Sequence, residues 1–135
     1  MTRINIISVE KISNKQLMAE YHESIRVFSY VLKSKKIPED IPSRYCLGKG
    51  HVKFFFNKIP YLLNRYKEIN KELTNRGYRL NNETFSKNLE KGKLALARYP
   101  EIQVSNWVPS SEEMTVNQAR IDERLGRILV KRKSF

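Results

Sequence analysis

The strongest constraint on the fold is a run of apolar residues with helical spacing in the first quarter of the chain. They recur at intervals of four, four, three and four positions and therefore share one helix face: Leu17, Tyr21, Ile25, Phe28 and Leu32. Ser13 is a suitable N-cap for a helix that begins at Asn14. The helix is predicted to end near Lys35, because the residue before Pro38 disfavours helical backbone angles.

Two further helices are predicted downstream. The second has Pro60 near its first turn and Gly77 just after its last, with an apolar face formed by Leu62, Tyr66, Ile69 and Leu73. The third begins with a capping box that pairs Ser110 with Glu113 and runs to about Val130. Its apolar side is predicted to carry Met114, Ile121, Leu125 and Ile128. Its other side carries a basic stripe that repels itself unless an anion lies against it, namely Arg120, Arg124, Arg127 and Lys131.

The remaining segments contain weaker signals. Residues 38–50 are punctuated by proline and glycine and are predicted to form a loop. The apolar run at 52–56 is core material of ambiguous secondary structure, and residues 78–109 are predicted to be an ordered irregular segment anchored by Tyr99 and Trp107. No linker or repeat interrupts the chain. We therefore expect an all-α fold, one compact domain over residues 1–135 in which three main helices cluster with long ordered loops.

The charge balance points to a polyanionic partner. The 135 residues include 26 lysines and arginines against 14 acids, a formal net charge of +12. Such a field attracts nucleic acid by steering and by counterion release. The alternative is a surface charge that serves solubility alone.

Cysteine and histidine usage limits the chemistry further. Cys46 is the only cysteine and there are two histidines, so an intrachain disulfide or a Cys/His zinc cluster is excluded, and we expect no metal and no cofactor. The apolar stretch at 4–9 is too short for a secretory signal, and no run of about 18 apolar residues is available to span a membrane. We therefore expect an intracellular, cytoplasmic monomer without membrane contact.

The chain start offers a nucleophile. If Met1 is removed, Thr2 has a free α-amino group with a pKa of about 7.7 to 8, so a useful fraction is neutral near pH 7. A frayed terminus is the alternative. On the first helix Glu23 supplies a carboxylate, for which the alternative is a surface ion pair with Arg26 at i, i+3. A lone histidine is more often structural than catalytic, so neither His22 nor His51 is assigned to catalysis.

Four sequence blocks carry a resemblance to a known family. They are Met1-Thr2-Arg3-Ile4-Asn5, Leu17-Met18-Ala19-Glu20-Tyr21 leading into Glu23, Arg26, Val27 and Phe28, then Leu47-Gly48-Lys49-Gly50-His51-Val52, and finally Gln118-Ala119-Arg120 with Asp122-Glu123. Their content and order resemble pyrimidine dimer DNA glycosylases of the phage endonuclease V type. The resemblance covers residues 1 to about 125 and needs no gap in the first 33 positions.

The resemblance implies a bifunctional DNA repair enzyme of a bacterial or virus-infected cell. It would excise UV-induced cyclobutane pyrimidine dimers from double-stranded DNA and cleave the resulting abasic site by β-elimination through an imine. Carried over by position, Thr2 is the nucleophile through its α-amine and Glu23 is the catalytic carboxylate. The alternatives are a DNA-binding protein of the same fold with abasic-site lyase activity only or no catalysis, and an unrelated basic RNA-binding or partner-binding helical module.

The resemblance also assigns the DNA contacts. Arg3 and Arg26 would hold phosphates around the lesion, and Arg120 and Arg124 would contact the DNA backbone from the third helix. His22 stands where the family usually has arginine, which predicts a weaker or pH-dependent phosphate contact. The chain also departs from the family at its end, where a tail rich in tryptophan and tyrosine is common and residues 128–135 hold one aromatic residue.

Overall fold

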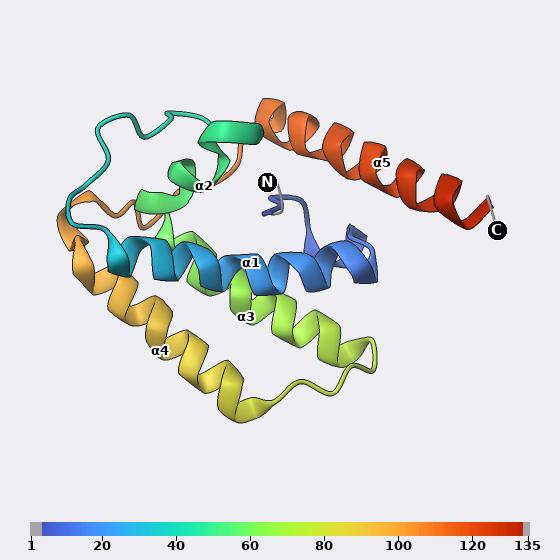
Figure 1. Ribbon diagram of the computed structural model, residues 1–135, viewed down its shortest axis with the longest axis horizontal. Helices are drawn as coiled ribbons and strands as arrows, with labels where there is room; N and C mark the ends of the chain where they lie inside the picture. The colour runs from blue at the N-terminus through green and yellow to red at the C-terminus, as the bar shows by residue number, and fades with distance from the viewer. Residues whose placement is uncertain (1–3, 134–135) are drawn as a thin grey trace.

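The fold is all-α over the part of the chain that can be described, as predicted. In the computed structural model the backbone is described for residues 4–133 and the side chains for residues 4–126 (Figure 1). The helices are α1 (Asn14–Lys33), α2 (His51–Phe54), α3 (Ile59–Asn75), α4 (Asn82–Arg98) and α5 (Ser111–Lys133). Short 3-10 turns join them: η1 (Val9–Lys11), η2 (Gly48–Gly50), η3 (Phe55–Asn57) and η4 (Pro100–Ile102).

Three predicted helices are confirmed, together with the residues that mark where each begins or ends. The hydroxyl of Ser13 accepts from the amide of Gln16 at 3.3 Å and caps α1, which ends at Lys33, two residues before the predicted point. Gly77 follows α3 with a φ of +99°, a left-handed conformation that favours glycine. At α5 the capping box forms in both directions, between Ser110 and Glu113, at 3.0 and 3.1 Å.

The expectation of an irregular segment over residues 78–109 is wrong, because α4 fills half of it. Asn81 caps this helix by accepting from the amide of Thr84 at 2.9 Å. The buried positions of this helix are the small residues Gly92 and Ala95, and its larger apolar residues Phe85, Leu89 and Leu96 are only partly buried against the core. A Cβ at Gly92 would lie 2.3 Å from Cδ2 of Leu63, so glycine permits a close approach of α4 to α3. α4 therefore adds a fourth long helix to the three predicted.

The core lies where α1, α3 and α4 pack against one another (Figure 1). One cluster centres on Phe28 and the run Phe54–Phe56, and the other on Leu17, with Tyr21 and Tyr66 stacked at 4.6 Å. The apolar run at 52–56, whose secondary structure was ambiguous from the sequence, is thus helical, and its three phenylalanines are buried. Trp107 packs edge-on against Tyr61, at 4.7 Å between ring centroids, and so anchors the segment before α5 as predicted.

α5 lies on the other side of α1 from α4 (Figure 1). The apolar side predicted for this helix is wrong in part: Ile121 is buried, but Met114 and Leu125 are exposed, and the side chain of Ile128 is outside the described residues. The buried face instead consists of Glu113, Asn117 and Ile121, at intervals of four. This face is largely polar because α5 is attached through hydrogen bonds to backbone groups. Among the described residues, none of the helices has the length and apolarity needed to cross a membrane.

Candidate active site

The N-terminal segment, from Ile4 to the start of α1, lies between α1 and α5 (Figure 1). Its later residues, Ile7 and Val9, belong to the core cluster of Leu17, near the start of α1. Ile4 belongs to the other cluster, with Val27 further along α1. The segment therefore runs antiparallel to α1, and near its start Asn5 bonds to Glu20, one helical turn before Glu23.

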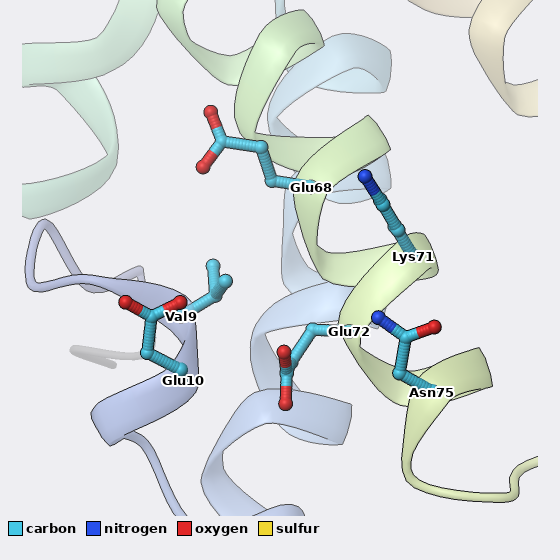
Figure 2. Close-up of a pocket in the computed structure, with 6 residues that line it drawn as sticks. All are labelled: Val9, Glu10, Glu68, Lys71, Glu72 and Asn75. Atoms are coloured by element: carbon cyan, nitrogen blue, oxygen red, sulfur yellow. The ribbon is translucent and has the colours of Figure 1, made fainter.

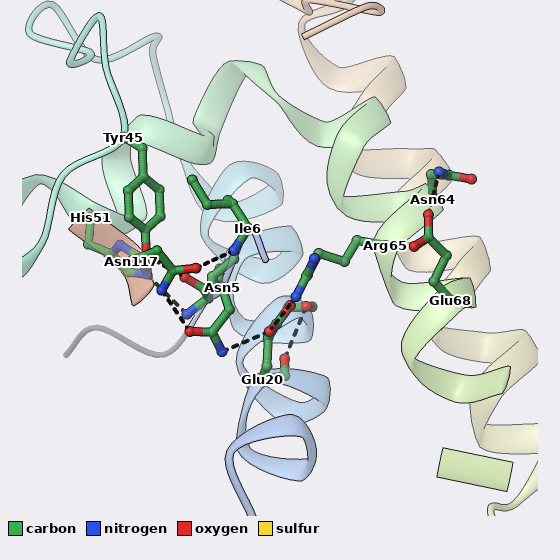
Figure 3. Close-up of polar contacts among 11 residues, drawn as sticks. Asn5, Ile6, Glu20, Tyr45, His51, Asn64, Arg65, Glu68 and Asn117 are labelled. Carbon is green, nitrogen blue, oxygen red and sulfur yellow. Dashed lines mark hydrogen bonds and ion pairs between the residues drawn. The ribbon is translucent and has the colours of Figure 1, made fainter. Parts of the chain in front are cut away.

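A buried chain of hydrogen bonds joins this segment to three helices (Figure 3). The amide of Ile6 donates to Oδ1 of Asn117 on α5 at 2.6 Å, and Nδ2 of Asn117 donates to Oδ1 of Asn5 at 2.9 Å. Nδ2 of Asn5 in turn donates to Oε1 of Glu20 on α1 at 2.9 Å. Arg65 on α3 completes the chain through two bonds to Glu20. These bonds fix the segment between α1 and α5.

The Glu20–Arg65 pair is structural. Both side chains are almost fully buried, at 0% and 6% exposure. Burial lowers the pKa of Arg65, but the charge and hydrogen bonds of Glu20 outweigh this effect and raise the pKa above its usual value. Arg65 therefore remains charged, and the two side chains satisfy each other in a place where an unpaired charge is costly.

Glu23 lies one helical turn after Glu20 and is also buried. Its Oε2 is 3.7 Å from Nη1 of Arg26, so the two form an ion pair that is longer than a hydrogen bond. The Arg26 side chain is 73% exposed, and His22 is exposed as well. The middle of α1 thus presents a sheltered carboxylate next to cationic or titratable groups open to solvent.

α5 brings two of the predicted cations to the same region. Arg120 and Arg124 follow Asn117 at i+3 and i+7 and so share its side of the helix. Arg120 pairs with Glu123 at 3.1 Å, and Arg124 is partly buried. The N-terminal segment therefore lies between two helices that each carry predicted DNA contacts. Thr2 and Arg3, and the side chains of Arg127 and Lys131, are outside the described residues.

Two side chains bind the first described residue, Ile4: Tyr45 from the loop before α2, and His51, the first residue of α2, both labelled in Figure 3. The amide of Ile4 donates to Nε2 of His51 at 3.1 Å, and the hydroxyl of Tyr45 donates to the carbonyl of Ile4 at 2.9 Å. Burial, together with the nearby charge of Arg124, lowers the pKa of His51 to about 4, although a hydrogen bond to the Cys46 carbonyl opposes this shift. His51 is therefore a neutral structural residue at pH 7, as its sequence context suggested.

Sequence reasoning missed the polar residues that hold this segment, namely Asn5, Glu20, Tyr45, Arg65 and Asn117. Buried polar groups follow no hydrophobic period, because their positions depend on partners far away in the chain. Asn117 offered one usable signal, since it stands midway between the capping Glu113 and the apolar Ile121 at intervals of four.

A surface pocket between η1 and α3 is unsuited to nucleic acid (Figure 2). It is lined by Val9, Glu10, Glu68, Lys71, Glu72 and Asn75. With three carboxylates and one ammonium group, the pocket repels phosphate. It contains none of the predicted site residues. Among the described residues, no group of three or more His, Cys, Asp or Glu side chains is arranged to hold a metal ion.

Comparison with protein families identifies a related family. A family model described as pyrimidine dimer DNA glycosylase matches residues 1–86. The matched region contains the N-terminal segment, α1, α2 and α3, and therefore the Glu20–Arg65 pair, Glu23, Arg26 and the His51 anchor. Asn117, Arg120 and Arg124 lie beyond it.

Proposed function

Because the chain belongs to the pyrimidine dimer DNA glycosylase family, we propose that it excises cyclobutane pyrimidine dimers and then cleaves the abasic site through the α-amine of Thr2. Its substrate is DNA, and the dimer-containing or abasic duplex is the form that this chemistry requires. The observation that carries the proposal is the course of the N-terminal segment, which runs antiparallel to α1 and is bonded through Asn5 to Glu20, one helical turn before Glu23.

The reaction begins with attack on the sugar. The lone pair of the Thr2 nitrogen attacks C1′ of the deoxyribose, the glycosidic bond breaks, and its electrons leave with the base, which takes up a proton. Loss of a proton from nitrogen and opening of the sugar ring give an imine between Thr2 and C1′. Removal of Met1 is required, because an amide nitrogen has no usable nucleophilicity.

Glu23 acts in both halves of the reaction. Its negative charge stabilises the positive charge that develops at C1′ as the base leaves. The imine makes the C2′ proton acidic, and the carboxylate accepts that proton as the C3′–O bond breaks. Burial of Glu23 supports this role, because a carboxylate acts more strongly on a reacting carbon in a site that excludes water.

The cations hold the DNA backbone. Arg26 is exposed, and with Arg3 and His22 it binds the phosphates around the lesion. Arg120 and Arg124 bind the backbone from α5. Because C1′ inside a duplex is inaccessible to an amine fixed in the protein, the DNA must bend or extrude a nucleotide.

The test is single-turnover cleavage of two duplexes, one with a single cyclobutane dimer and one with an abasic site, by protein whose first residue is established by intact mass. We expect protein that begins at Thr2 to cleave both duplexes, and protein that retains Met1 to cleave neither. Abasic cleavage is expected to be robust and dimer cleavage less selective, because residues 128–135 hold one aromatic residue where the family commonly has several. Equal activity of the two protein forms would contradict the role of the α-amine.

A further inference from the structure

Ile4 is held by side chains at both of its backbone polar groups. His51 accepts its N–H at 3.1 Å and Tyr45 donates to its C=O at 2.9 Å. Ile4 itself is fully buried. Neither bond belongs to a backbone helix or sheet ladder, so the position of Ile4 depends on two side chains, Tyr45 from the loop before α2 and His51 at the first position of α2.

The hydrogen bonds of His51 define which ring nitrogen is protonated. Nδ1 lies 2.9 Å from the carbonyl oxygen of Cys46, which can only accept, so Nδ1 carries the proton. Nε2 therefore presents a lone pair to the amide of Ile4. The ring is fully buried and lies edge-on between Tyr45 and Phe55, at 5.4 and 5.5 Å between ring centroids, so it has one orientation and no access to DNA.

Tyr45 has an equally fixed geometry. Its own amide donates to Oε2 of Glu113 at 2.6 Å, which ties the loop to the start of α5. Burial raises the pKa of the Tyr45 phenol far above its usual value, so the hydroxyl remains a donor. The two side chains that hold Ile4 are thus fixed in turn: Tyr45 through its amide to Glu113 of α5, and His51 through Nδ1 to the carbonyl of Cys46.

We propose that His51 is the positioning residue for the nucleophilic amine, acting through its hydrogen bond to the backbone of Ile4. This inference rests on the proposed role of Thr2. Ile4 stands two residues after Thr2, and two residues of chain span at most about 7 Å, so fixing Ile4 limits where the amine can go. A shift of about 1 Å between reacting atoms can cost on the order of 100-fold in rate.

Two substitutions separate the hydrogen bonds of His51. In His51→Gln the amide group reaches the position of Nε2, so its oxygen can accept from Ile4 while the bond to Cys46 is lost. In His51→Asn the amide nitrogen takes the position of Nδ1 and keeps the bond to Cys46, but nothing reaches Ile4. If His51 had only a general structural role, both variants would lose activity alike. The positioning role requires that His51→Gln keeps the reaction rate that His51→Asn loses.

The measurement is the single-turnover rate of borohydride trapping on saturating abasic duplex, with the Kd for an uncleavable abasic analogue measured in parallel. We expect His51→Asn to lose at least tenfold in rate with Kd changed less than threefold, and His51→Gln to remain within about threefold of the parent in both quantities. Equal rates in the two variants, or a loss confined to Kd, would overturn the inference.

Two controls keep the test decisive. The first is Tyr45→Phe, which is nearly isosteric and removes only the bond to the Ile4 carbonyl, so it can be used if His51→Asn does not fold. We expect Tyr45→Phe to lower the trapping rate without changing Kd. An unchanged trapping rate would count against the inference. Failure of the parent protein, beginning at Thr2, to trap any abasic duplex would instead overturn the proposed function itself.

Discussion

At the scale of single residues, two glutamates one turn apart have different surroundings and so different roles. Glu20 is fully buried and satisfied by Arg65 and Asn5, which commits it to structure. Glu23 has a 3.7 Å contact with the exposed Arg26, and we propose it as the catalytic carboxylate. Sequence pattern alone could not distinguish them, because both occupy the same face of α1. The choice of Glu23 came from resemblance to the family, and the partners of Glu20 come from distant parts of the chain.

Replacing each glutamate with glutamine should separate these roles. We expect Glu23→Gln to retain its fold and DNA affinity and to lose about 100-fold or more in single-turnover strand cleavage, because the change removes the proton acceptor and the charge together. Glu20→Gln should lower the free energy of unfolding by about 3 to 5 kcal/mol, because it leaves the Arg65 charge buried without its partner. Urea unfolding and cleavage assays on both variants decide the matter, and a Glu23→Gln protein that still cleaves DNA at the parent rate would refute the assignment.

At the scale of elements, the helices that the sequence predicted are those with both an apolar stripe and an end signal. α1 has the Ser13 cap and α3 ends before Gly77, so their positions followed from local chemistry. α4 was missed because the buried centre of its apolar face is made of the small residues Gly92 and Ala95, and a glycine inside a helix argues locally against one. The buried face of α5 was misassigned because its contacts are hydrogen bonds made by Glu113 and Asn117 to other segments.

The glycines inside α4 and α5, Gly92 and Gly126, provide a test of this packing. Gly92→Ala should lower the free energy of unfolding by about 1 to 2 kcal/mol, because the new methyl group would overlap Leu63 and press on Phe28, and overpacking outweighs the gain in helix propensity. Gly126→Ala on α5 meets nothing within 4 Å and should instead be neutral or stabilising by up to about 1 kcal/mol. A stabilised Gly92→Ala protein in urea unfolding would mean that α4 packs less closely than described.

At the scale of the whole molecule, two features support the proposal that DNA binds over the N-terminal segment: the formal charge of +12, and the arrangement of α1 and α5 on either side of that segment. The charge was evident from composition. The arrangement was not, because it depends on the hydrogen bonds that attach α5 to Asn5 and Ile6, which pair positions more than 100 apart in the sequence.

This arrangement predicts where salt sensitivity resides. We expect binding to abasic duplex to weaken steeply with salt, and Arg124→Gln to reduce the log-log slope by about 0.9, the value of one phosphate contact. Lys87→Gln is the matched control, since Lys87 lies on α4, pairs with Glu83 at 3.4 Å and is on the other side of α1 from α5. Titrations at several salt concentrations compare the slopes. If Arg124→Gln and Lys87→Gln change the slope equally, α5 is not the DNA-binding face.

The central claim, that the α-amine of Thr2 forms the covalent link to DNA, is tested most directly by finding the linked atom. Protein that begins at Thr2 is trapped with borohydride on an abasic duplex, digested with protease and nuclease, and the modified peptide is sequenced by mass spectrometry. The account predicts one adduct, on the N-terminal peptide and on the nitrogen of Thr2. An adduct on a lysine side chain, or no adduct from correctly processed protein, would contradict it.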